Sequence, residues 1–277
     1  MELFDNHAHY NDEKFNEDRD EVIKTAYNSG VTKMICAGYN IESSKKAIEI
    51  ANEYDFIYTT CGISPNDIPD DSEDYEESYE KFKEQLVEVE ELAQNKKVVA
   101  IGEIGLDYYW NTDNKEFQRQ TFVDQIKLAN KLNLPIVIHS RDAVYDTLDI
   151  LKNVQKVNKP SVFHCCQLNV DLVREALKLG FYISFAGPIT FKNSKNAKEI
   201  VNMVPVDKIL IETDSPYLAP EPVRGTRNTS YNVRYVLNKI AEFRNVPVEE
   251  LAKQIYNNSL KVYNILIWKI GENWQFC

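Results

Sequence analysis

The feature that most constrains the fold is a repeated alternation of short apolar runs with segments of helical periodicity. Eight runs rich in β-branched and aromatic residues recur along the chain, at 3–9, 34–38, 57–63, 98–103, 135–139, 161–164, 182–186 and 209–214. The runs are mostly continuous rather than alternating, which indicates parallel strands buried on both faces. Eight such units predict a (β/α)8 TIM barrel of class α/β, and an open doubly wound sheet is the weaker alternative.

Length and composition fit one globular domain. A barrel of this kind occupies about 250 residues, so the 277 residues are expected to form a single metal-dependent hydrolase domain, 1–277, with terminal helices from about 231–265. No apolar run approaches the roughly 18 residues of a membrane span, and the first residues lack a signal-peptide pattern. Five cysteines without metal-finger spacing suit a reducing compartment. We therefore expect a soluble cytoplasmic protein.

The net charge of −11 argues against a broad basic surface for nucleic acid. Much of the acid lies between Asp67 and Glu91, where Tyr75, Phe82 and Val89 recur at helical spacing. This pattern predicts an amphipathic helix whose carboxylates face solvent.

Residues able to bind a metal follow five of the eight runs. In the opening stretch Asp5-Asn6-His7-Ala8-His9, the period of two in a strand puts both imidazoles on one face. The full set is His7, His9, Glu103, His139, His164 and Asp214, and it includes all four histidines. The carboxyl ends of barrel strands are where active sites assemble, so the set predicts a metal centre there.

Six ligands are too many for one tetrahedral site and suit two metals that share a bridging carboxylate. Such a pair can activate water and stabilise the leaving oxygen of a phosphodiester, which favours hydrolysis. Imidazole ligands favour zinc or manganese over magnesium, and the identity of the metal stays open among these three.

Several segments together carry a family resemblance. They are Asp5-Asn6-His7-Ala8-His9, Ala100-Ile101-Gly102-Glu103-Ile104-Gly105-Leu106-Asp107-Tyr108, Pro135-Ile136-Val137-Ile138-His139-Ser140-Arg141, Phe163-His164-Cys165, Ile211-Glu212-Thr213-Asp214-Ser215-Pro216-Tyr217-Leu218 and Arg224-Gly225-Thr226-Arg227-Asn228. From about residue 3 to about 264, the chain resembles the TatD-family metal-dependent deoxyribonucleases of the amidohydrolase superfamily.

The resemblance implies a division of roles. His7, His9 and Asp214 would hold one metal, His139 and His164 the other, and Glu103 would bridge them. Asp214, Glu103 and Glu212 are the expected catalytic residues: Asp214 would orient or deprotonate the attacking water, and Glu212 would bind water or support the ligands from behind. Asp107 receives no metal. The implied activity is divalent-cation-dependent cleavage of DNA, usually as an exonuclease.

The sequence departs from the family pattern at two places. Ser64 and Asn66 stand where the family usually has two histidines that face the substrate, so contact with phosphate is in question there. After His164-Cys165, Cys166-Gln167-Leu168 stands where the family usually has an aromatic residue and a small Ser-Gly pair, and this loop is expected to differ in shape.

Basic and aromatic residues near the strand ends are candidate substrate contacts. Arg141, Lys192, Arg224 and Arg227, together with Ser64 and Asn66, are predicted to bind DNA as a single strand or strand end. Tyr108, Tyr109 and Trp110 suit base stacking, core packing or loop anchoring alike. No obligate protein partner is evident.

Two other readings stay open. One is a related hydrolase of ester, lactone or amide bonds on the same metal centre. Such relatives carry a carbamylated lysine at the end of the fourth strand, and Glu103 at that position favours the nuclease. The other is a noncatalytic metal- or nucleic-acid-binding protein that has kept the scaffold.

Overall fold

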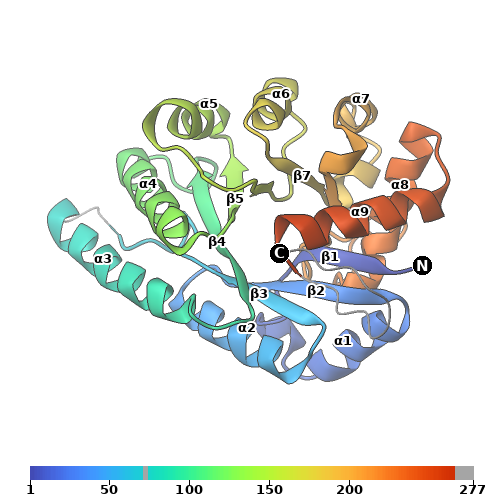
Figure 1. Cartoon of the computed structure of the whole chain (residues 1–277), viewed down its shortest axis with the longest axis horizontal. Helices are drawn as coiled ribbons and strands as arrows, with labels where there is room; N and C mark the ends of the chain where they lie inside the picture. Colours follow the sequence, from blue (N-terminus) through green and yellow to red (C-terminus); the bar gives the residue numbers. More distant parts are fainter. Residues whose placement is uncertain (71–73, 266–277) are drawn as a thin grey trace, which may run out of the picture.

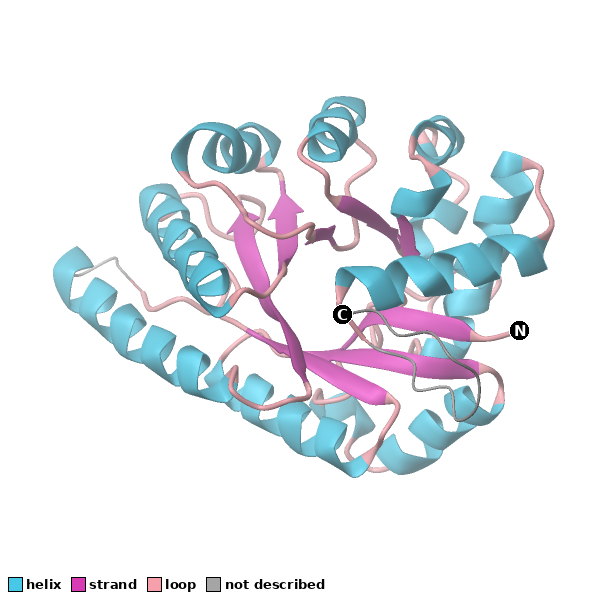
Figure 2. Cartoon of the chain, viewed as in Figure 1, coloured by secondary structure: helices cyan, strands magenta, loops and turns pink. Residues whose placement is uncertain are grey.

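Eight parallel strands form the centre of the molecule. The computed structural model describes residues 1–70 and 74–265. The strands are β1 (Leu3–Ala8), β2 (Val31–Ala37), β3 (Ile57–Cys61), β4 (Val98–Asp107), β5 (Ile136–Arg141), β6 (Val162–Phe163), β7 (Tyr182–Phe185) and β8 (Ile209–Ile211). They pair in chain order from β1 to β8, so the structure confirms the predicted single-domain (β/α)8 barrel (Figure 2).

Helices surround the strands, as Figure 1 shows. They are α1 (Arg19–Asn28), α2 (Ile41–Glu53), α3 (Tyr75–Leu92), α4 (Lys115–Leu132), α5 (Val144–Asp149), α6 (Val170–Lys178), α7 (Ala197–Met203), α8 (Val233–Arg244) and α9 (Val248–Val262). A π-helical turn, Ile150–Val154, extends α5. The predicted terminal helices correspond to α8 and α9. Between strands and helices lies an apolar layer that contains Ile23, Phe82 and Phe122.

The barrel closes where β1 meets the segment after β8. Ala8 pairs with Ser215 in a parallel bridge, and the Asp214 N–H donates to the His7 carbonyl at 2.8 Å. Below this bridge, the Asp5 carboxylate accepts hydrogen bonds from the backbone and hydroxyl of Thr213, at 2.9 and 2.6 Å. Asp5 therefore ties the first strand to the last.

One end of the barrel is filled by α9. A second apolar cluster joins side chains from the barrel strands, such as Phe4, Val137 and Leu210, to Tyr256 and Leu260 of α9. Figure 1 shows α9 lying close to the N-terminal end of β1. α9 therefore covers the end of the barrel opposite to the carboxyl ends of the strands. The predicted metal ligands lie near those carboxyl ends.

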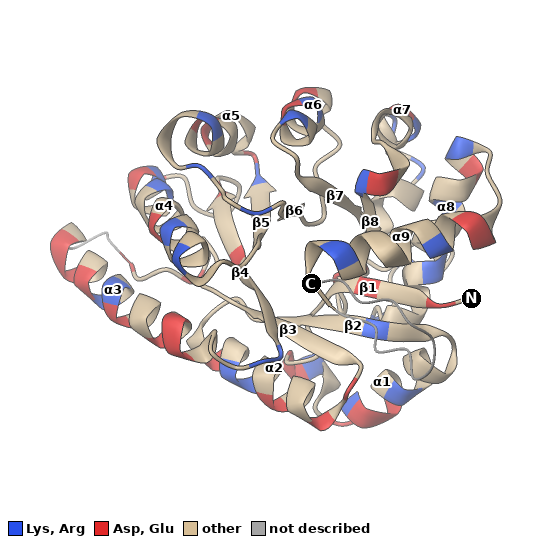
Figure 3. Ribbon diagram, viewed as in Figure 1, with Lys and Arg blue, Asp and Glu red and all other residues tan. Residues whose placement is uncertain are grey.

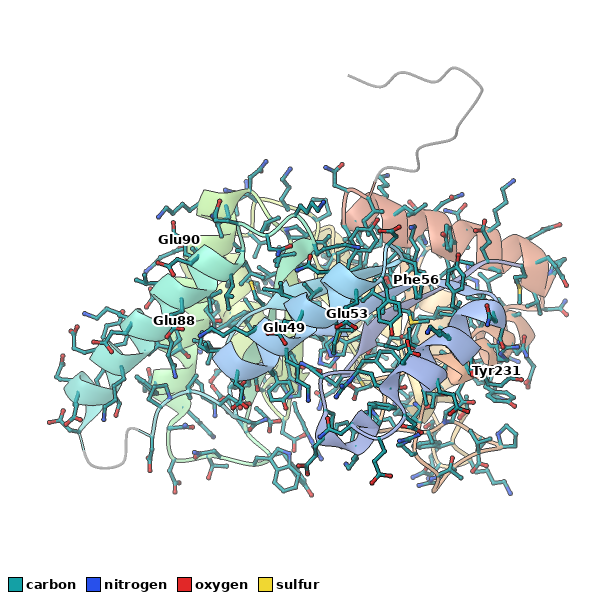
Figure 4. The ribbon with its side chains drawn as sticks, turned by 90° about the horizontal axis from the view of Figure 1, so that it is seen from below. Glu49, Glu53, Phe56, Glu88, Glu90 and Tyr231 are labelled. Carbon is teal, nitrogen blue, oxygen red and sulfur yellow. The ribbon has the colours of Figure 1, made fainter. Side chains whose placement is uncertain are left out.

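The acidic segment forms the expected amphipathic helix. In α3, Phe82 and Val89 are buried, whereas most carboxylates are exposed. Figure 3 shows acidic residues recurring along α3, and Figure 4 labels Glu88 and Glu90. Some of these carboxylates pair with lysines of neighbouring helices, as Glu88 does with Lys45 at 2.9 Å. Asp71 and Glu73 of this acidic run lie outside the described residues. The net negative charge is thus concentrated away from the barrel interior.

Two strand boundaries differ from the prediction. β4 continues for four residues past Glu103, with an irregular register against β5 between Ile101 and Ile104. β8 ends at Ile211 rather than Asp214. The reason is that Thr213 donates its N–H to the Asp5 side chain, and Asp214 takes a left-handed conformation with φ of 58°. Within the described residues, no helix combines the length and apolarity that a membrane crossing requires.

Candidate metal centre

Glu103 lies at the centre of the candidate site, with its two carboxylate oxygens facing two different groups of histidines. Oε2 lies 3.3 Å from Nε2 of His7 and 3.9 Å from Nε2 of His9. Oε1 lies 2.9 Å from Nδ1 of His139 and 3.2 Å from Nε2 of His164. The carboxylate therefore connects two clusters of nitrogen atoms, as a bridging ligand would.

The first cluster contains His7, His9 and Asp214. The two Nε2 atoms of the histidines are 3.2 Å apart, and Oδ1 of Asp214 is 3.2 Å from that of His9 and 3.8 Å from that of His7. One potential ligand atom from each of the three residues lies within 4.8 Å of the others. Nitrogen and carboxylate oxygen at such distances match the donors that bind zinc or manganese.

The second cluster contains His139 and His164 on the other side of Glu103. Nδ1 of His139 is 3.3 Å from Nε2 of His164. The ring of His164 also stacks on that of His7, with centroids 4.1 Å apart. The two clusters are therefore adjacent and share one wall of imidazole rings.

The far nitrogens of three imidazoles face oxygen acceptors. Nδ1 of His9 lies 3.2 Å from the Ala37 carbonyl, and Nε2 of His139 lies 2.8 Å from Oδ2 of Asp107. Nδ1 of His164 is 3.4 Å from Glu212, without the geometry of a hydrogen bond. The contacts of His9 and His139 favour a proton on the outer nitrogen of these two rings, which leaves their inner lone pairs directed at the centre. The donor set thus fits metal ions.

The electrostatics of the site favour positive charge. Burial disfavours the ionised form of Glu103, but the charge and hydrogen bonds of the surrounding histidines outweigh it and hold its pKa well below the usual range. Burial likewise opposes protonation of His164, but the nearby Glu103 and Glu212 raise its pKa well above normal. Both pKa shifts arise because carboxylates are packed among imidazoles. A cation bound between them would interact favourably with the same carboxylates.

Local backbone structure places the ligands. His7 is the penultimate residue of β1, and His9 follows the strand directly, where its N–H donates to the Ser215 carbonyl at 2.6 Å. The left-handed turn at Asp214 is a sparsely populated conformation for a residue other than glycine. Because this turn follows β8 directly, it brings Asp214 beside the histidines of β1.

Asp107 is a further carboxylate of this site, to which the sequence assigns no metal. Its carboxylate contacts His139 and also accepts hydrogen bonds from the backbone amides of Tyr109 and Trp110, at 2.9 and 3.1 Å. Burial opposes ionisation, but the bond to His139 outweighs it and lowers the pKa of Asp107 to about 2. The signal in the sequence is its spacing of four from Glu103, which puts both on one face of β4.

Gly105 stands between Glu103 and Asp107 and permits the close approach of β4 to β5. A Cβ atom there would lie 1.9 Å from the His139 carbonyl oxygen, and its φ of 142° disfavours other residues. The glycine therefore allows His139 to reach the centre.

The surroundings of Glu212 bear on the two roles expected for it, binding water or supporting the ligands. Its side chain has no exposed surface, and its oxygens accept hydrogen bonds from the Cys165 N–H at 2.6 Å and the Ser184 hydroxyl at 2.5 Å. The carboxylate is thus enclosed behind His164, with Nδ1 of that ring 3.4 Å from its Oε1. Of the two roles foreseen for Glu212, the geometry favours support of the histidine.

The predicted substrate contacts are distributed unevenly. Asn66 is exposed and donates to Asp107 at 3.3 Å, whereas Ser64 is buried beneath it and accepts from the Asn66 N–H at 3.2 Å. These residues thus lie beside the second cluster, separated from His139 by one carboxylate.

The basic side chains also differ from one another. Arg227 forms an ion pair with Asp18 and donates to the Lys14 carbonyl, so its charge is already engaged. Arg224 lies over the ring of Phe191 at 4.2 Å, Arg141 lies over Tyr109, and Lys192 is exposed. Arg141 follows His139 by two residues, at the end of β5.

The barrel and its cluster of histidines and carboxylates define a metal-dependent hydrolase. The chain belongs to the TatD-related DNase family, whose model matches residues 4–264. This result confirms the resemblance inferred from the sequence motifs.

Similar proteins cover nearly the whole chain. The uncharacterized metal-dependent hydrolase YabD of Bacillus subtilis is 41% identical over 263 residues, which are 95% of this chain and 99% of that protein. The uncharacterized metal-dependent hydrolase YcfH of Escherichia coli K12 is 35% identical, with 96% and 97% covered. The crystal structure of YJJV, a TatD homologue from Escherichia coli K12, matches with a TM-score of 0.85 at 25% identity, covering 95% of this chain and 98% of that one.

Proposed function

We propose that the protein is a divalent-metal-dependent deoxyribonuclease that hydrolyses phosphodiester bonds in single-stranded DNA or at strand ends, with exonuclease action. The observation that carries this proposal is the position of Glu103, whose two oxygens face His7 and His9 on one side and His139 and His164 on the other. Membership of the TatD-related DNase family supports DNA as the substrate class.

Six residues would hold two divalent cations, namely His7, His9, Glu103, His139, His164 and Asp214. Magnesium, manganese or zinc bound there would supply Lewis-acid chemistry that activates water and stabilises the leaving oxygen of the diester. The side chains of Asp214 and His139 are 15% and 20% exposed, so this chemistry faces the open end of the barrel.

Asp214 is the residue proposed to accept a proton from the attacking water. Its carboxylate is partly exposed, and burial is outweighed by the nearby His9, which keeps the pKa of Asp214 below its ordinary value. Asp214 is therefore ionised at neutral pH and can bind and orient water. Removal of a positioned acid–base group typically costs a factor of about 10²–10⁴ in rate.

The charge distribution suits the end of a strand better than a long duplex. Most carboxylates of α3 are exposed, while Arg141 is the last residue of β5 and Arg224 lies in the segment after β8. A small positively charged region at the open end of the barrel, on an otherwise acidic protein, favours contact with a few phosphates. The proposal also places the enzyme in the cytoplasm and has it act without an obligate protein partner.

The test is digestion of a single-stranded oligodeoxynucleotide, labelled separately at each end, with magnesium, manganese or zinc ions. We expect products that shorten one nucleotide at a time, loss of activity on chelation, and recovery when metal is restored. Asp214→Asn is expected to lower the rate at least 100-fold, whereas Asp113→Asn, in an exposed loop, leaves it unchanged.

Full activity of Asp214→Asn would contradict the proposed role of this residue. A metal-loaded wild type that leaves DNA intact but hydrolyses a lactone, ester or amide would instead support a related hydrolase. Metal binding without hydrolysis of any of these substrates would indicate a noncatalytic relative.

A further inference from the structure

Two exposed aromatic side chains stand beside the candidate metal centre. Tyr109 and Trp110, which follow β4, are 53% and 69% exposed. Their rings meet edge to face, with centroids 4.8 Å apart. Exposed apolar side chains that lie in contact with one another, unlike scattered single ones, can mark a binding surface.

A guanidinium group supports the first ring. Cζ of Arg141 lies 3.7 Å from the centroid of the Tyr109 ring and 5.5 Å from that of Trp110. An arginine so placed orders the tyrosine by cation–π attraction and adds positive charge beside it. The three side chains form a basic aromatic platform, Tyr109–Trp110–Arg141.

The platform is fixed to the metal centre through one carboxylate. Oδ1 of Asp107 accepts the backbone N–H groups of Tyr109 and Trp110, while its Oδ2 faces Nε2 of His139. The amide of Asn66 also donates to Oδ2, at 3.3 Å. The aromatic rings thus keep a defined position relative to His139.

A cavity adjoins the platform. It has a volume of about 570 Å³ and is lined in part by Pro65, Asn66, Ile68, Trp110, Asn111 and Asn114. Cavities of about 300–1,000 Å³ hold small organic ligands. Its walls combine an indole ring and three amides, which suits a planar heterocycle with hydrogen-bonding edges.

We propose that the Tyr109–Trp110–Arg141 platform binds a nucleobase of single-stranded DNA, next to the phosphodiester held at the metal centre. This inference rests on the proposed nuclease function and names the part of the substrate that the chain recognises. Stacking accepts every base because each has a π face, so the platform confers affinity for single strands without strong sequence preference. A base paired in a duplex is not available to it.

The test measures the affinity of metal-loaded protein for a fluorescent thymidine decamer with hydrolysis-resistant phosphorothioate linkages. A second decamer carries abasic nucleotides at all positions. We expect Tyr109→Ala/Trp110→Ala to weaken binding of the first decamer roughly tenfold to a hundredfold and to change binding of the abasic decamer less than twofold. Trp110→Phe, which keeps a ring, is expected to stay near the wild type.

The matched control is Tyr231→Ala. Tyr231 (Figure 4) is 36% exposed and lies 3.8 Å below Cζ of Arg234, beside the end of α1. This change is expected to affect neither decamer. Because Asp107 binds backbone amides, truncation of the two side chains keeps its hydrogen bonds, and the single Trp110→Ala variant serves if the double variant does not fold.

The outcomes separate this inference from the proposed function. Equal binding of both decamers by the double variant and the wild type, or an equal loss on both, overturns the platform. Base-dependent binding by a wild type that cleaves no DNA retains the platform and overturns the nuclease. DNA cleavage by a wild type that binds both decamers equally overturns the platform and retains the nuclease.

Discussion

The carboxylate of Asp107 lies 2.8 Å from Nε2 of His139, on the side of the imidazole opposite to Glu103, whose Oε1 is 2.9 Å from Nδ1. The ring is therefore held between two carboxylates. Glu103 lies at the centre of the site, where it can share a metal with His139. Asp107 lies on the outer side of the ring and sets its orientation and protonation.

Asp107→Asn is predicted to weaken divalent-metal binding about 10- to 100-fold, because the neutral amide orients His139 less strongly. Calorimetric titration of metal-free protein with manganese would measure the loss. Asp113→Asn, which changes an exposed aspartate of the loop after β4, should bind as the wild type does. Unchanged affinity in Asp107→Asn would remove the proposed support of His139.

Glu212→Gln is predicted to weaken one metal site and spare the other. Glu212 faces Nδ1 of His164, which lies on the Oε1 side of Glu103, while His7 and His9 lie on the Oε2 side. Metal content after dialysis at a limiting concentration should fall from two ions per chain toward one. Glu199→Gln, on the exposed surface of α7, is the control. Loss of both ions together, with an intact fold, would speak against separate clusters.

Leu260→Ala is predicted to lower the free energy of unfolding by about 2–4 kcal/mol, since Leu260 of α9 packs into the apolar cluster that fills one end of the barrel. Urea unfolding measures this change. The metal affinity of the folded variant should equal that of the wild type, because the ligands lie at the other end. A marked loss of metal affinity would show that the two ends are coupled.

Asp124→Asn is predicted to destabilise the fold by ~1 kcal/mol at pH 7 and by less at pH 3. Burial opposes ionisation of Asp124, but hydrogen bonds from Lys127, Tyr79 and Gln120 outweigh it and lower its pKa. A carboxyl with a depressed pKa stabilises the fold above its unfolded pKa of about 3.9 and loses that contribution as the pH falls through its folded pKa. Urea midpoints of both proteins should therefore converge on acidification. A constant difference would show that charge is not the cause.

The sequence predicts the barrel because each strand is a distinct apolar run. It also predicts that the metal ligands lie close together, because each stands near the end of one of these runs. His7 and His9 were placed on one face by the period of a strand. Glu103 was expected at the end of β4 but lies within it, since β4 runs on to Asp107 with an irregular register. Such irregularities depend on contacts with β5 that the local sequence does not encode.

Other features required the three-dimensional contacts. Arg227 stood out as a basic residue after β8, but its ion pair with Asp18 joins positions 209 residues apart. The enclosure of Glu212 depends on Ser184 and Cys165, from other units of the barrel. Exposure of Tyr109 and Trp110 was one of several possibilities that the sequence left open. Pairings between distant units arise from packing, which periodicity does not specify.

The most direct test of a metal centre divided by Glu103 is anomalous diffraction from crystals of the manganese-loaded protein. The account predicts two anomalous peaks, one among His7, His9 and Asp214 and one beside His139 and His164, with the Glu103 carboxylate between them. A single peak, or peaks that do not contact Glu103, would contradict it.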